Sequence, residues 1–595
     1  MAAKDHVLAI QEALKKSKID AYIIPSSDPH QSEYVADHWK SREWVSGFTG
    51  SAGLVVITQK EAGLWTDSRY FLQAETELKA SGMVLHKQFI QGAPDHIEWL
   101  VNTLDQGSMV AFDGKCFSIA QVDAMQKEFA KAGISIDSSI DFVAAAWKDR
   151  PLLPSGKFFE LPEKYTGESR TERINRIRKH LKESDAHHYL ITTLDDLCWV
   201  FNIRSNDVEY NPVCIAYAVI SRDGATLFVD EAKVPDSIKK SFTDEKISLQ
   251  AYDAIEPFLK KLKKPEKIWV DKSTASAWLG AAISKDLLIV DANLPKGMKA
   301  IKNKTEIKHI RQAMIQDGVS LTKAFMWLEA ELSKRRVTEV EVAEQLIKCR
   351  AVHKDYIGES FGAIIGYASN GAIIHYHPEQ GKCASIKQEG ILLIDSGGQY
   401  KCGTTDITRT LAVGKPTSEQ KLHFTMVLKG NIALSRAKFP KGTRGVQLDI
   451  LARQFLWQHG LNYLHGTGHG VGFFLNVHEP PQGFITGLAE RGTTVIEPGM
   501  LTSNEPGFYV EGSHGIRIEN LVLTVEDEVT PYGEFLSFET VTLAPIDRNL
   551  ISSKYLTPDE KAWLNNYHAT VFERLSPHLT KKEAKWLKEK TKPIK

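Results

Sequence analysis

The sequence predicts a mixed α/β protein in which two similar α/β units precede a larger C-terminal region. Ile19–Phe71 and Ala186–Val234 each begin with a short apolar strand and a segment led by Trp-Val. Each then continues with a longer strand and a last strand that closes on Thr-Asp or Val-Asp. This similarity indicates a duplicated α/β domain, and it is too weak to indicate a solenoid. Beyond Gly362 the pattern changes to short strands, turns and a few helices.

Length and composition fit a globular protein of several domains. The chain has 595 residues, enough for about three or four ordinary domains. It is 42% apolar and 25% charged, with 74 basic and 74 acidic residues. This balance gives no electrostatic reason to expect nucleic acid or a membrane surface as a partner. No apolar run approaches the ~20 residues of a membrane span.

The termini and cysteines favour a cytoplasmic protein. Met1–Lys16 lacks the apolar core of a signal peptide and predicts an amphipathic helix. The six cysteines form no Cys-x-x-Cys pair, which argues against a zinc ribbon and a disulfide framework. A reducing compartment is therefore expected.

Two boundaries divide the chain into predicted domains at 1–155, 156–302 and 303–595. Lys148–Ser169 is rich in Pro and Gly and predicts the first linker, before a helical pattern at Arg170–Glu183. The second boundary falls within Pro295–Met314. Arg335–Ala351 predicts a helix that begins with a Thr-x-x-Glu motif at Thr338. A long helix before it is predicted by apolar residues near the helical period: Ile307, Ile310, Met314, Leu321, Phe325 and Leu328.

Two acidic residues stand out in Glu389–Gly414, which predicts a β-hairpin with a wide loop. Asp395 ends one apolar strand, and Asp406 is predicted to lie inside the neighbouring strand. A buried carboxylate needs a cation or several hydrogen-bond donors. An ion pair between Asp406 and Arg409 is the structural alternative to a metal site.

A second pair of acids lies in Pro498–Val525. Glu505 follows an apolar strand and precedes a Pro-Gly turn. Gly515–Val525 predicts another strand, in which Arg517 and Glu519 share a face because they are two residues apart. Acids that face inward need a cation or a basic partner, and an Arg517–Glu519 ion pair is the alternative here.

Leu464–Pro481 holds three histidines in a Gly-rich run. His465 and His469 are four apart, the spacing of a helical zinc motif, but Gly-Thr-Gly separates them and two more glycines follow. Such a run does not hold a helix, and no Glu follows His465. An extended Gly-rich segment aims each histidine separately. A packed or surface position remains the alternative for any single histidine.

The four acids described above and one of the histidines form a ligand set rich in carboxylate oxygens with one imidazole. Such a set suits two divalent ions bridged by carboxylates, and Mn²⁺ fits it better than metals that prefer thiolates. Two ions about 3.5–4 Å apart share a hydroxide and polarise a carbonyl, which is hydrolytic chemistry used by aminopeptidases. The proposed ligands are Asp395, Asp406, His469, Glu505 and Glu519.

Four motifs together resemble the long, three-domain form of the aminopeptidase P (Xaa-Pro aminopeptidase) family. They are DSGGQYKCGTTDITRT, YLHGTGHGVGFFLNVHE, NEPGFY and GIRIEN, and further matches at AYIIPSSDPHQSEY, WTDSRYFLQAE and WLNNYH extend the resemblance along the chain. It implies two creatinase-N-like α/β domains and a C-terminal domain with the pita-bread metallopeptidase fold. That fold is shared with methionine aminopeptidase, prolidase and creatinase.

The resemblance also implies a role for each site residue. Asp395 would be a terminal ligand of one ion, Asp406 and Glu519 would bridge both ions, and His469 and Glu505 would complete the other shell. Glu505 would also relay a proton to the leaving nitrogen. The residues implied on the substrate side are His465 and His478, as catalytic and binding histidines, together with His375, Arg517 and Arg69; Arg517 would also orient a metal-binding carboxylate.

The implied activity is removal of the first residue from peptides with proline in second place, by a hydroxide shared between two ions. Mn²⁺ is expected, with Co²⁺ and Zn²⁺ as alternatives. The resemblance implies a homodimer; no nucleic acid or membrane partner is expected. Two alternatives stay open: a prolidase that cuts Xaa-Pro dipeptides, and a pita-bread protein that binds peptides without cutting them.

Overall fold

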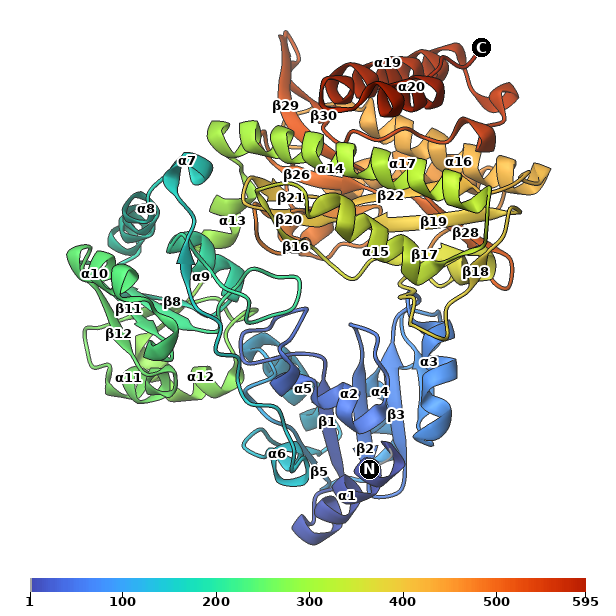
Figure 1. Cartoon of the computed structure of the whole chain (residues 1–595). Helices are drawn as coiled ribbons and strands as arrows, with labels where there is room; N and C mark the ends of the chain where they lie inside the picture. Colours follow the sequence, from blue (N-terminus) through green and yellow to red (C-terminus); the bar gives the residue numbers. More distant parts are fainter. Residues whose placement is uncertain (1–2) are drawn as a thin grey trace. The chain divides into compact units, whose positions relative to one another are not determined.

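The computed structural model describes residues 3–595, which divide into two compact units (Figure 1). The N-terminal unit runs to Pro162 and continues over Glu168–Pro295. The C-terminal unit holds Glu163–Gly167 and Lys296–Lys595. The domain boundaries proposed from the sequence, after residues 155 and 302, stay predictions. Met1 and Ala2 of the expected first helix lie outside the described residues.

The N-terminal unit contains two six-stranded sheets with the same topology. Their orders are β4-β3-β2-β1-β5-β6 and β12-β11-β10-β8-β13-β14. In each sheet the first strand pairs antiparallel with the second and parallel with a later strand. The shared order confirms the predicted duplication. The strands are β1 Ala21–Pro25, β2 Leu54–Thr58, β3 Ala62–Thr66, β4 Val84–Lys87, β5 Met109–Ala111, β6 Ser135–Asp137, β8 His188–Ile191, β10 Tyr217–Ser221, β11 Ala225–Phe228, β12 Ile247–Gln250, β13 Ile268–Val270 and β14 Leu288–Val290.

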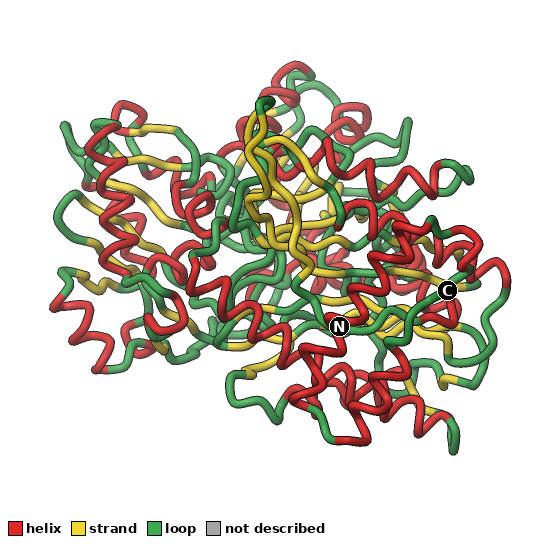
Figure 2. The backbone as a smooth tube through the Cα atoms, turned by 90° about the horizontal axis from the view of Figure 1, so that it is seen from above, coloured by secondary structure: helices red, strands yellow, loops and turns green. Residues whose placement is uncertain are grey.

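Helices accompany both sheets, and Figure 2 shows helix and strand mixed along the chain. Helix α1 (Ala3–Ser17) buries Val7, Ile10 and Leu14 on one face, as its amphipathic pattern predicts. Helix α8 (Arg170–Glu183) has the predicted bounds and begins with a Ser169–Glu172 capping box. Other helices of this unit are α4 His96–Thr103, α5 Ile119–Lys131, α9 Leu194–Val200, α10 Asp236–Asp244, α11 Ile255–Lys261 and α12 Ala277–Ala282.

Part of the predicted first linker is ordered against the C-terminal unit. Helix α7 (Glu163–Thr166) packs on helix α14 (Lys304–Leu332). The Tyr165 hydroxyl donates to Asp355 at 2.9 Å, and Asn303 Nδ2 donates to the Thr166 carbonyl at 2.7 Å. Pro and Gly content marked the break between units but gave no sign of this contact.

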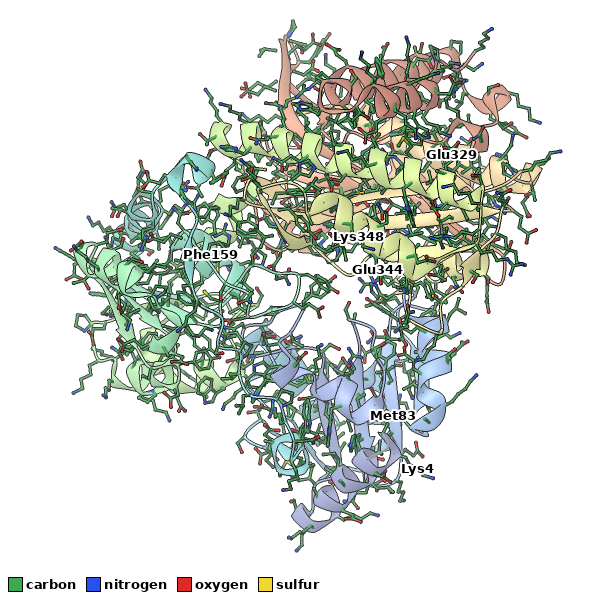
Figure 3. All side chains as sticks on the ribbon, viewed as in Figure 1. Lys4, Met83, Phe159, Glu329, Glu344 and Lys348 are labelled. Atoms are coloured by element: carbon green, nitrogen blue, oxygen red, sulfur yellow. The ribbon has the colours of Figure 1, made fainter. Side chains whose placement is uncertain are left out.

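Two predicted helices open the C-terminal unit. Helix α14 begins with an Asn303–Glu306 capping box, and α15 (Glu339–Arg350) begins with the predicted box between Thr338 and Glu341. Of the six residues in the predicted apolar stripe of α14, five are buried and Ile307 is only half-buried. Glu344 and Lys348, one turn apart on α15, are labelled in Figure 3.

The C-terminal unit carries the strands that matter for the chemistry. A three-stranded sheet has the order β17-β19-β22, and a six-stranded sheet has the order β23-β30-β29-β26-β24-β25. The antiparallel pairing of β19 with β22 confirms the predicted hairpin. The strands are β17 Ile364–Tyr367, β19 Ile391–Ser396, β22 Ile407–Ala412, β23 Lys438–Pro440, β24 Gly468–Gly470, β25 Glu479–Phe484, β26 Leu501–Asn504, β27 Gly507–Val510, β28 His514–Arg517, β29 Asn520–Thr530 and β30 Gly533–Thr540.

Helices α16 and α17 pack on strands of this unit, and α19 and α20 pack on α14 and on each other. Their apolar side chains join strands β27, β28 and the segment after β30 in one buried cluster that includes Phe424, Ile518 and Leu564. Ile516 and Ile518 of this cluster flank Arg517, and Ile518 directly precedes Glu519. The helices are α16 Ser418–Ser435, α17 Gly445–Trp457, α19 Pro558–Leu575 and α20 Lys581–Lys590.

Candidate metal centre

The two aspartates lie where β19 and β22 meet. Asp395, near the end of β19, is opposite Thr408 of β22. Asp406 directly precedes β22, so its predicted position inside that strand is wrong. The reason is local: Thr405 bonds through its N–H to Gly398 and through its carbonyl to Ser360 Oγ, and the ladder with β19 therefore begins only at residue 407.

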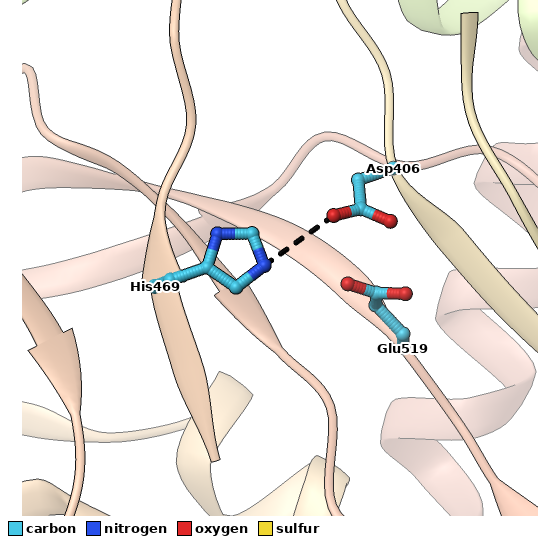
Figure 4. A group of neighbouring side chains, drawn as sticks. All are labelled: Asp406, His469 and Glu519. Carbon is cyan, nitrogen blue, oxygen red and sulfur yellow. Dashed lines mark ion pairs between the residues drawn. The ribbon is translucent and has the colours of Figure 1, made fainter. Parts of the chain in front are cut away.

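His469 enters the site from β24, as an extended and not a helical residue. Its glycine neighbours permit a close approach of the chain, because a Cβ on Gly468 would lie 1.9 Å from the Ser503 carbonyl oxygen. The Nδ1–H of His469 donates to the Gly470 carbonyl at 2.9 Å. In the neutral imidazole this leaves Nε2 without a proton, and Nε2 lies 3.4 Å from both Asp406 Oδ2 and Glu505 Oε1. Figure 4 shows His469 with Asp406 and Glu519.

The two glutamates come from the end of β26 and from a break between two strands. The predicted single strand over Gly515–Val525 is wrong, because β28 pairs with β27 while β29 pairs with β26. Ile518 and Glu519 lie between them. Glu519 N–H donates to the Thr408 carbonyl at 3.1 Å, and Glu519 Oε2 accepts from Thr408 Oγ1 at 2.9 Å. Glu519 thus lies in the break between the two strands, close to Asp406 and His469.

Burial makes this cluster costly without a cation. Burial raises the pKa of Asp395 and of Asp406 to about 6. Burial, and then the charges of Asp406 and Asp395, raise the pKa of Glu519 well above its usual value. Burial lowers the pKa of His469 to about 3, which keeps the imidazole neutral. The shifts of the three carboxyl groups disfavour the charged forms that a divalent cation would favour, and the neutral imidazole of His469 is the form that binds a metal.

The donor set fits divalent metal ions. Ligand atoms of Asp406, His469 and Glu519 lie within 4.8 Å of one another, the one such group found in residues 3–595. A neutral imidazole nitrogen that faces two carboxylates has no proton to offer them, so a cation is the natural partner for all three. Asp395 Oδ1 is buried and has no hydrogen-bond partner among the described residues. Such an orphaned oxygen is also a free ligand atom.

Arg517 and Tyr509 connect this cluster to His465. Arg517 Nη2 donates to Asp395 Oδ2 at 2.6 Å, and Nη1 donates to the Tyr509 hydroxyl at 2.7 Å. Because the His465 Nδ1–H donates to the Gly466 carbonyl at 2.7 Å, Nε2 of the neutral imidazole accepts from the Tyr509 O–H at 2.9 Å. Arg517 thus pairs with Asp395, and the alternative of an Arg517–Glu519 pair is wrong in this structure.

The other residues predicted on the substrate side are His478, His375 and Arg69. His478, half-buried, packs its ring edge-on against His469 at 4.3 Å between centroids. His375 follows Ile374, whose carbonyl lies 3.5 Å from Arg517 Nη2. Arg69 belongs to the N-terminal unit, where its guanidinium forms two hydrogen bonds with Asp67, at 2.8 and 2.7 Å.

Three hydroxyl residues of the site were missed from the sequence. Thr408 binds Glu519 and accepts from Arg517 Nε at 3.1 Å, and Ser503 Oγ donates to Glu505 at 3.1 Å and accepts from His469 N–H at 2.9 Å. Tyr509 is the third. Thr408 and Ser503 are each two residues from a predicted ligand, so same-face strand spacing could have indicated them.

Four family models match successive parts of the chain. The Creatinase/Prolidase N-terminal domain matches residues 7–142 and, in a second form, residues 149–306. Metallopeptidase family M24 matches residues 308–526, and the C-terminal region of peptidase M24 matches residues 534–594. The fold is therefore that of a pita-bread metallopeptidase domain preceded by two creatinase/prolidase N-terminal domains, as predicted.

Relatives that match along almost the whole chain identify one family within the M24 metallopeptidases. The chain is 41% identical over 611 residues to a probable Xaa-Pro aminopeptidase P of Pyrenophora teres f. teres, covering 99% of this chain and 92% of the relative. It is 40% identical over 620 residues to that of Pyricularia oryzae, covering 100% and 99%. The crystal structure of X-prolyl aminopeptidase from Caenorhabditis elegans, described as a cytosolic enzyme with a di-nuclear active site, superposes with a TM-score of 0.96 at 34% identity and full coverage of both chains. The chain belongs to the Xaa-Pro aminopeptidase P family of M24 metallopeptidases.

Proposed function

We propose that this protein is a metal-dependent Xaa-Pro aminopeptidase, which releases the first residue of peptides with proline in second place. The observation that carries the proposal is the position of His469 Nε2, 3.4 Å from a carboxylate oxygen of Asp406 and 3.4 Å from one of Glu505, in a buried cluster of acids. Full-length similarity to Xaa-Pro aminopeptidases P supports the substrate class.

Two divalent ions would be held by Asp395, Asp406, His469, Glu505 and Glu519, with Asp406 and Glu519 bridging. When bound, the ions supply the Lewis-acid and nucleophile-generating chemistry of amide hydrolysis. Carboxylate oxygens with one imidazole favour Mn²⁺ over metals that prefer thiolates, with Co²⁺ and Zn²⁺ as alternatives. The di-nuclear active site of the Caenorhabditis elegans enzyme supports the count of two.

Glu505 would carry the proton to the leaving nitrogen. Burial raises the pKa of Glu505, which suits a carboxyl that must take up a proton and release it. Ser503 holds Glu505 Oε1 by donating a hydrogen bond to it at 3.1 Å. The scissile bond before proline is a tertiary amide, so its nitrogen offers no N–H for recognition, and like any amide nitrogen it must be protonated as it leaves.

Histidines would bind the reacting peptide. We assign to His465 and His478 the stabilisation of the developing oxyanion and the binding of the peptide. His375 would also contact the substrate. Two hydrogen bonds fix the His465 ring: its Nδ1–H donates to the Gly466 carbonyl, and its Nε2 accepts from the Tyr509 hydroxyl. Arg517 would orient Asp395 and line the substrate side, and Arg69 would contact substrate from the N-terminal unit.

A comparison of two substrates tests this function against its nearest rival. Arg-Pro-Pro and the dipeptide Gly-Pro would be incubated with the protein, with added Mn²⁺ and again after chelation. Release of Arg that chelation abolishes and Mn²⁺ restores is the expected result. Cleavage of the dipeptide alone would indicate a prolidase, and no cleavage by folded, metal-loaded protein would indicate a binding protein.

We further propose a cytoplasmic homodimer. All six cysteines are free thiols, which suits a reducing compartment, and the Caenorhabditis elegans relative is described as cytosolic. Among residues 3–595, no helix combines the length and apolar character that crossing a bilayer requires. The homodimer rests on family resemblance, and sedimentation of the purified protein tests it.

A further inference from the structure

Arg409 is a buried cation that the chemistry proposed above does not use. Its side chain is 1% exposed, and no carboxylate of the described chain pairs with it, so the predicted alternative of an Asp406–Arg409 ion pair is wrong. The guanidinium donates only to neutral oxygens: the carbonyls of Thr408, Glu519, Ala544 and Pro545, Asn520 Oδ1 and the Tyr567 hydroxyl. Because burial of an unpaired charge costs free energy, we look for its benefit in the hydrogen bonds that the guanidinium makes or in its electric field.

Two of these carbonyls belong to the metal centre itself. Arg409 Nη1 donates to the Glu519 carbonyl at 2.6 Å and to the Thr408 carbonyl at 2.9 Å. Glu519 is a proposed bridging ligand, and Thr408 hydrogen-bonds its carboxylate at 2.9 Å. Arg409 therefore fixes the backbone on both sides of the Thr408–Glu519 contact, and it brings a positive charge toward the buried acids.

The other side of Arg409 is held by helix α19. The Tyr567 hydroxyl accepts from Arg409 Nη2 at 2.8 Å and lies 2.9 Å from the Ala544 carbonyl and 3.1 Å from the Thr542 carbonyl. The next residue, His568, accepts from the Ile546 N–H at 3.1 Å through Nε2. Tyr567 and His568 thus fix residues 542–546, which supply two of the acceptors of Arg409.

Helix α19 is itself anchored to the C-terminal unit. Lys429 of α16 donates to both carboxylate oxygens of Glu560 at 2.7 Å, in a largely buried pair. Glu329 of α14, labelled in Figure 3, accepts from Trp586 Nε1 at 2.7 Å and pairs with Lys590 at 2.8 Å on the following helix α20. The C-terminal helices therefore form a fixed support for the contacts of Tyr567.

We propose that Tyr567 and Arg409 are positioning residues of the metal centre, through which the C-terminal helix α19 sets the place of Glu519. The inference rests on the proposed function, because it assumes that Glu519 binds metal. It assigns the region after residue 534 a part in metal binding, although the metal-ligand candidates all precede it.

The test is metal affinity, measured apart from turnover. Tyr567→Phe removes one hydroxyl and keeps the ring. Its metal-free form would be titrated with Mn²⁺ by calorimetry, and its unfolding temperature would be measured with and without Mn²⁺. We expect affinity to fall about tenfold for at least one ion, the lower end of the effect seen for partners of metal ligands.

Tyr22→Phe is the matched control. Tyr22 is also a buried tyrosine, its hydroxyl donates to the Ile140 carbonyl at 3.0 Å, and it lies in the N-terminal unit. Its loss should leave Mn²⁺ affinity unchanged. A lower unfolding temperature with unchanged Mn²⁺ affinity in Tyr567→Phe would show a merely structural hydroxyl and overturn the proposal.

Arg409→Lys provides a second variant, and it decides alone if Tyr567→Phe does not fold. Lysine keeps the charge and loses the fork that reaches Thr408 and Glu519 together. Weaker Mn²⁺ binding than in the unsubstituted protein supports the proposal, and equal binding contradicts it. If the unsubstituted protein binds no Mn²⁺ or cuts no peptide, the proposed function fails; if it does both and the variants match it, this inference alone fails.

Discussion

At the scale of single residues, the site depends on carboxylates that are buried together. Asp406 is 4% exposed and Glu519 is 1% exposed, and the pKa of each is raised by burial. A metal ion would offset the cost of their charge, and the two carboxylates would in turn bind the ion. Removal of either carboxylate would therefore weaken metal binding at the other.

Asp406→Ala and Glu519→Ala are therefore expected to lose metal binding and turnover together. The bound metal would be counted by atomic emission after gel filtration, beside hydrolysis of Arg-Pro-Pro. Circular dichroism would establish that each variant is folded. Full activity in either folded variant would contradict the assignment of these residues as bridging ligands.

His478 is expected to separate binding of metal from binding of substrate. It packs on His469 but is not among the ligand atoms that cluster with Asp406 and Glu519. His478→Ala should keep its metal content and lose about 10²–10³-fold in kcat/KM, the usual cost of removing a group that stabilises an oxyanion. Kinetics equal to those of the unsubstituted protein would remove its assigned role.

Much of this site could be predicted from sequence, and the limits have physical causes. Acids beside apolar strands and a histidine in a Gly-rich run indicated the five proposed ligands, and the structure brings three of them, Asp406, His469 and Glu519, together. The partners of Arg517 and Arg409 could not be identified, because they depend on which strands pair across more than 100 residues. The break at Ile518–Glu519 was missed since the apolar pattern continues through it.

At the scale of elements, helix α19 buries a histidine that resists protonation. Burial, and then the charge of Arg409, lower the pKa of His568 from 6.5 to about 3. Below about pH 6.5 the unfolded chain binds a proton that the folded chain does not bind until about pH 3. The stability that His568 contributes is thus complete above pH 6.5 and falls as the pH drops toward 3.

His568→Gln is expected to reduce the loss of stability in acid. Glutamine can still accept from the Ile546 N–H and does not titrate. Urea unfolding of the metal-free proteins at about pH 7.5 and about pH 5.5 should show a loss smaller by about 1 kcal/mol in the variant. An unchanged difference between the two pH values would mean that His568 does not stay neutral in the folded state.

Elements with strong local signals were predicted well, and those that depend on distant contacts were not. The helical pattern at Arg170–Glu183, the Thr-x-x-Glu motif at Thr338 and the stripe of α14 gave helix positions directly. Helix α7 has four residues and is held by Asp355 and Asn303, so its own sequence could not indicate where it packs.

At the scale of the whole molecule, the N-terminal unit is predicted to take part in substrate binding through Arg69. Asp67 orients the guanidinium of Arg69. The Arg69 side chain is 26% exposed, so it can still donate a hydrogen bond to a peptide. Arg69→Ala should raise KM for Arg-Pro-Pro about tenfold, the worth of one charge-assisted hydrogen bond, with Mn²⁺ affinity unchanged. An unchanged KM would leave the N-terminal unit without a role in binding this substrate.

The most direct test of the account is a Mn²⁺ titration of the metal-free protein with Arg release from Arg-Pro-Pro as the signal. No release is expected without metal, and release should rise to a plateau once two ions are bound per chain. The same titration of Asp406→Ala should give no release. Cleavage that persists without metal, or that is retained in Asp406→Ala, would contradict the metal-dependent mechanism.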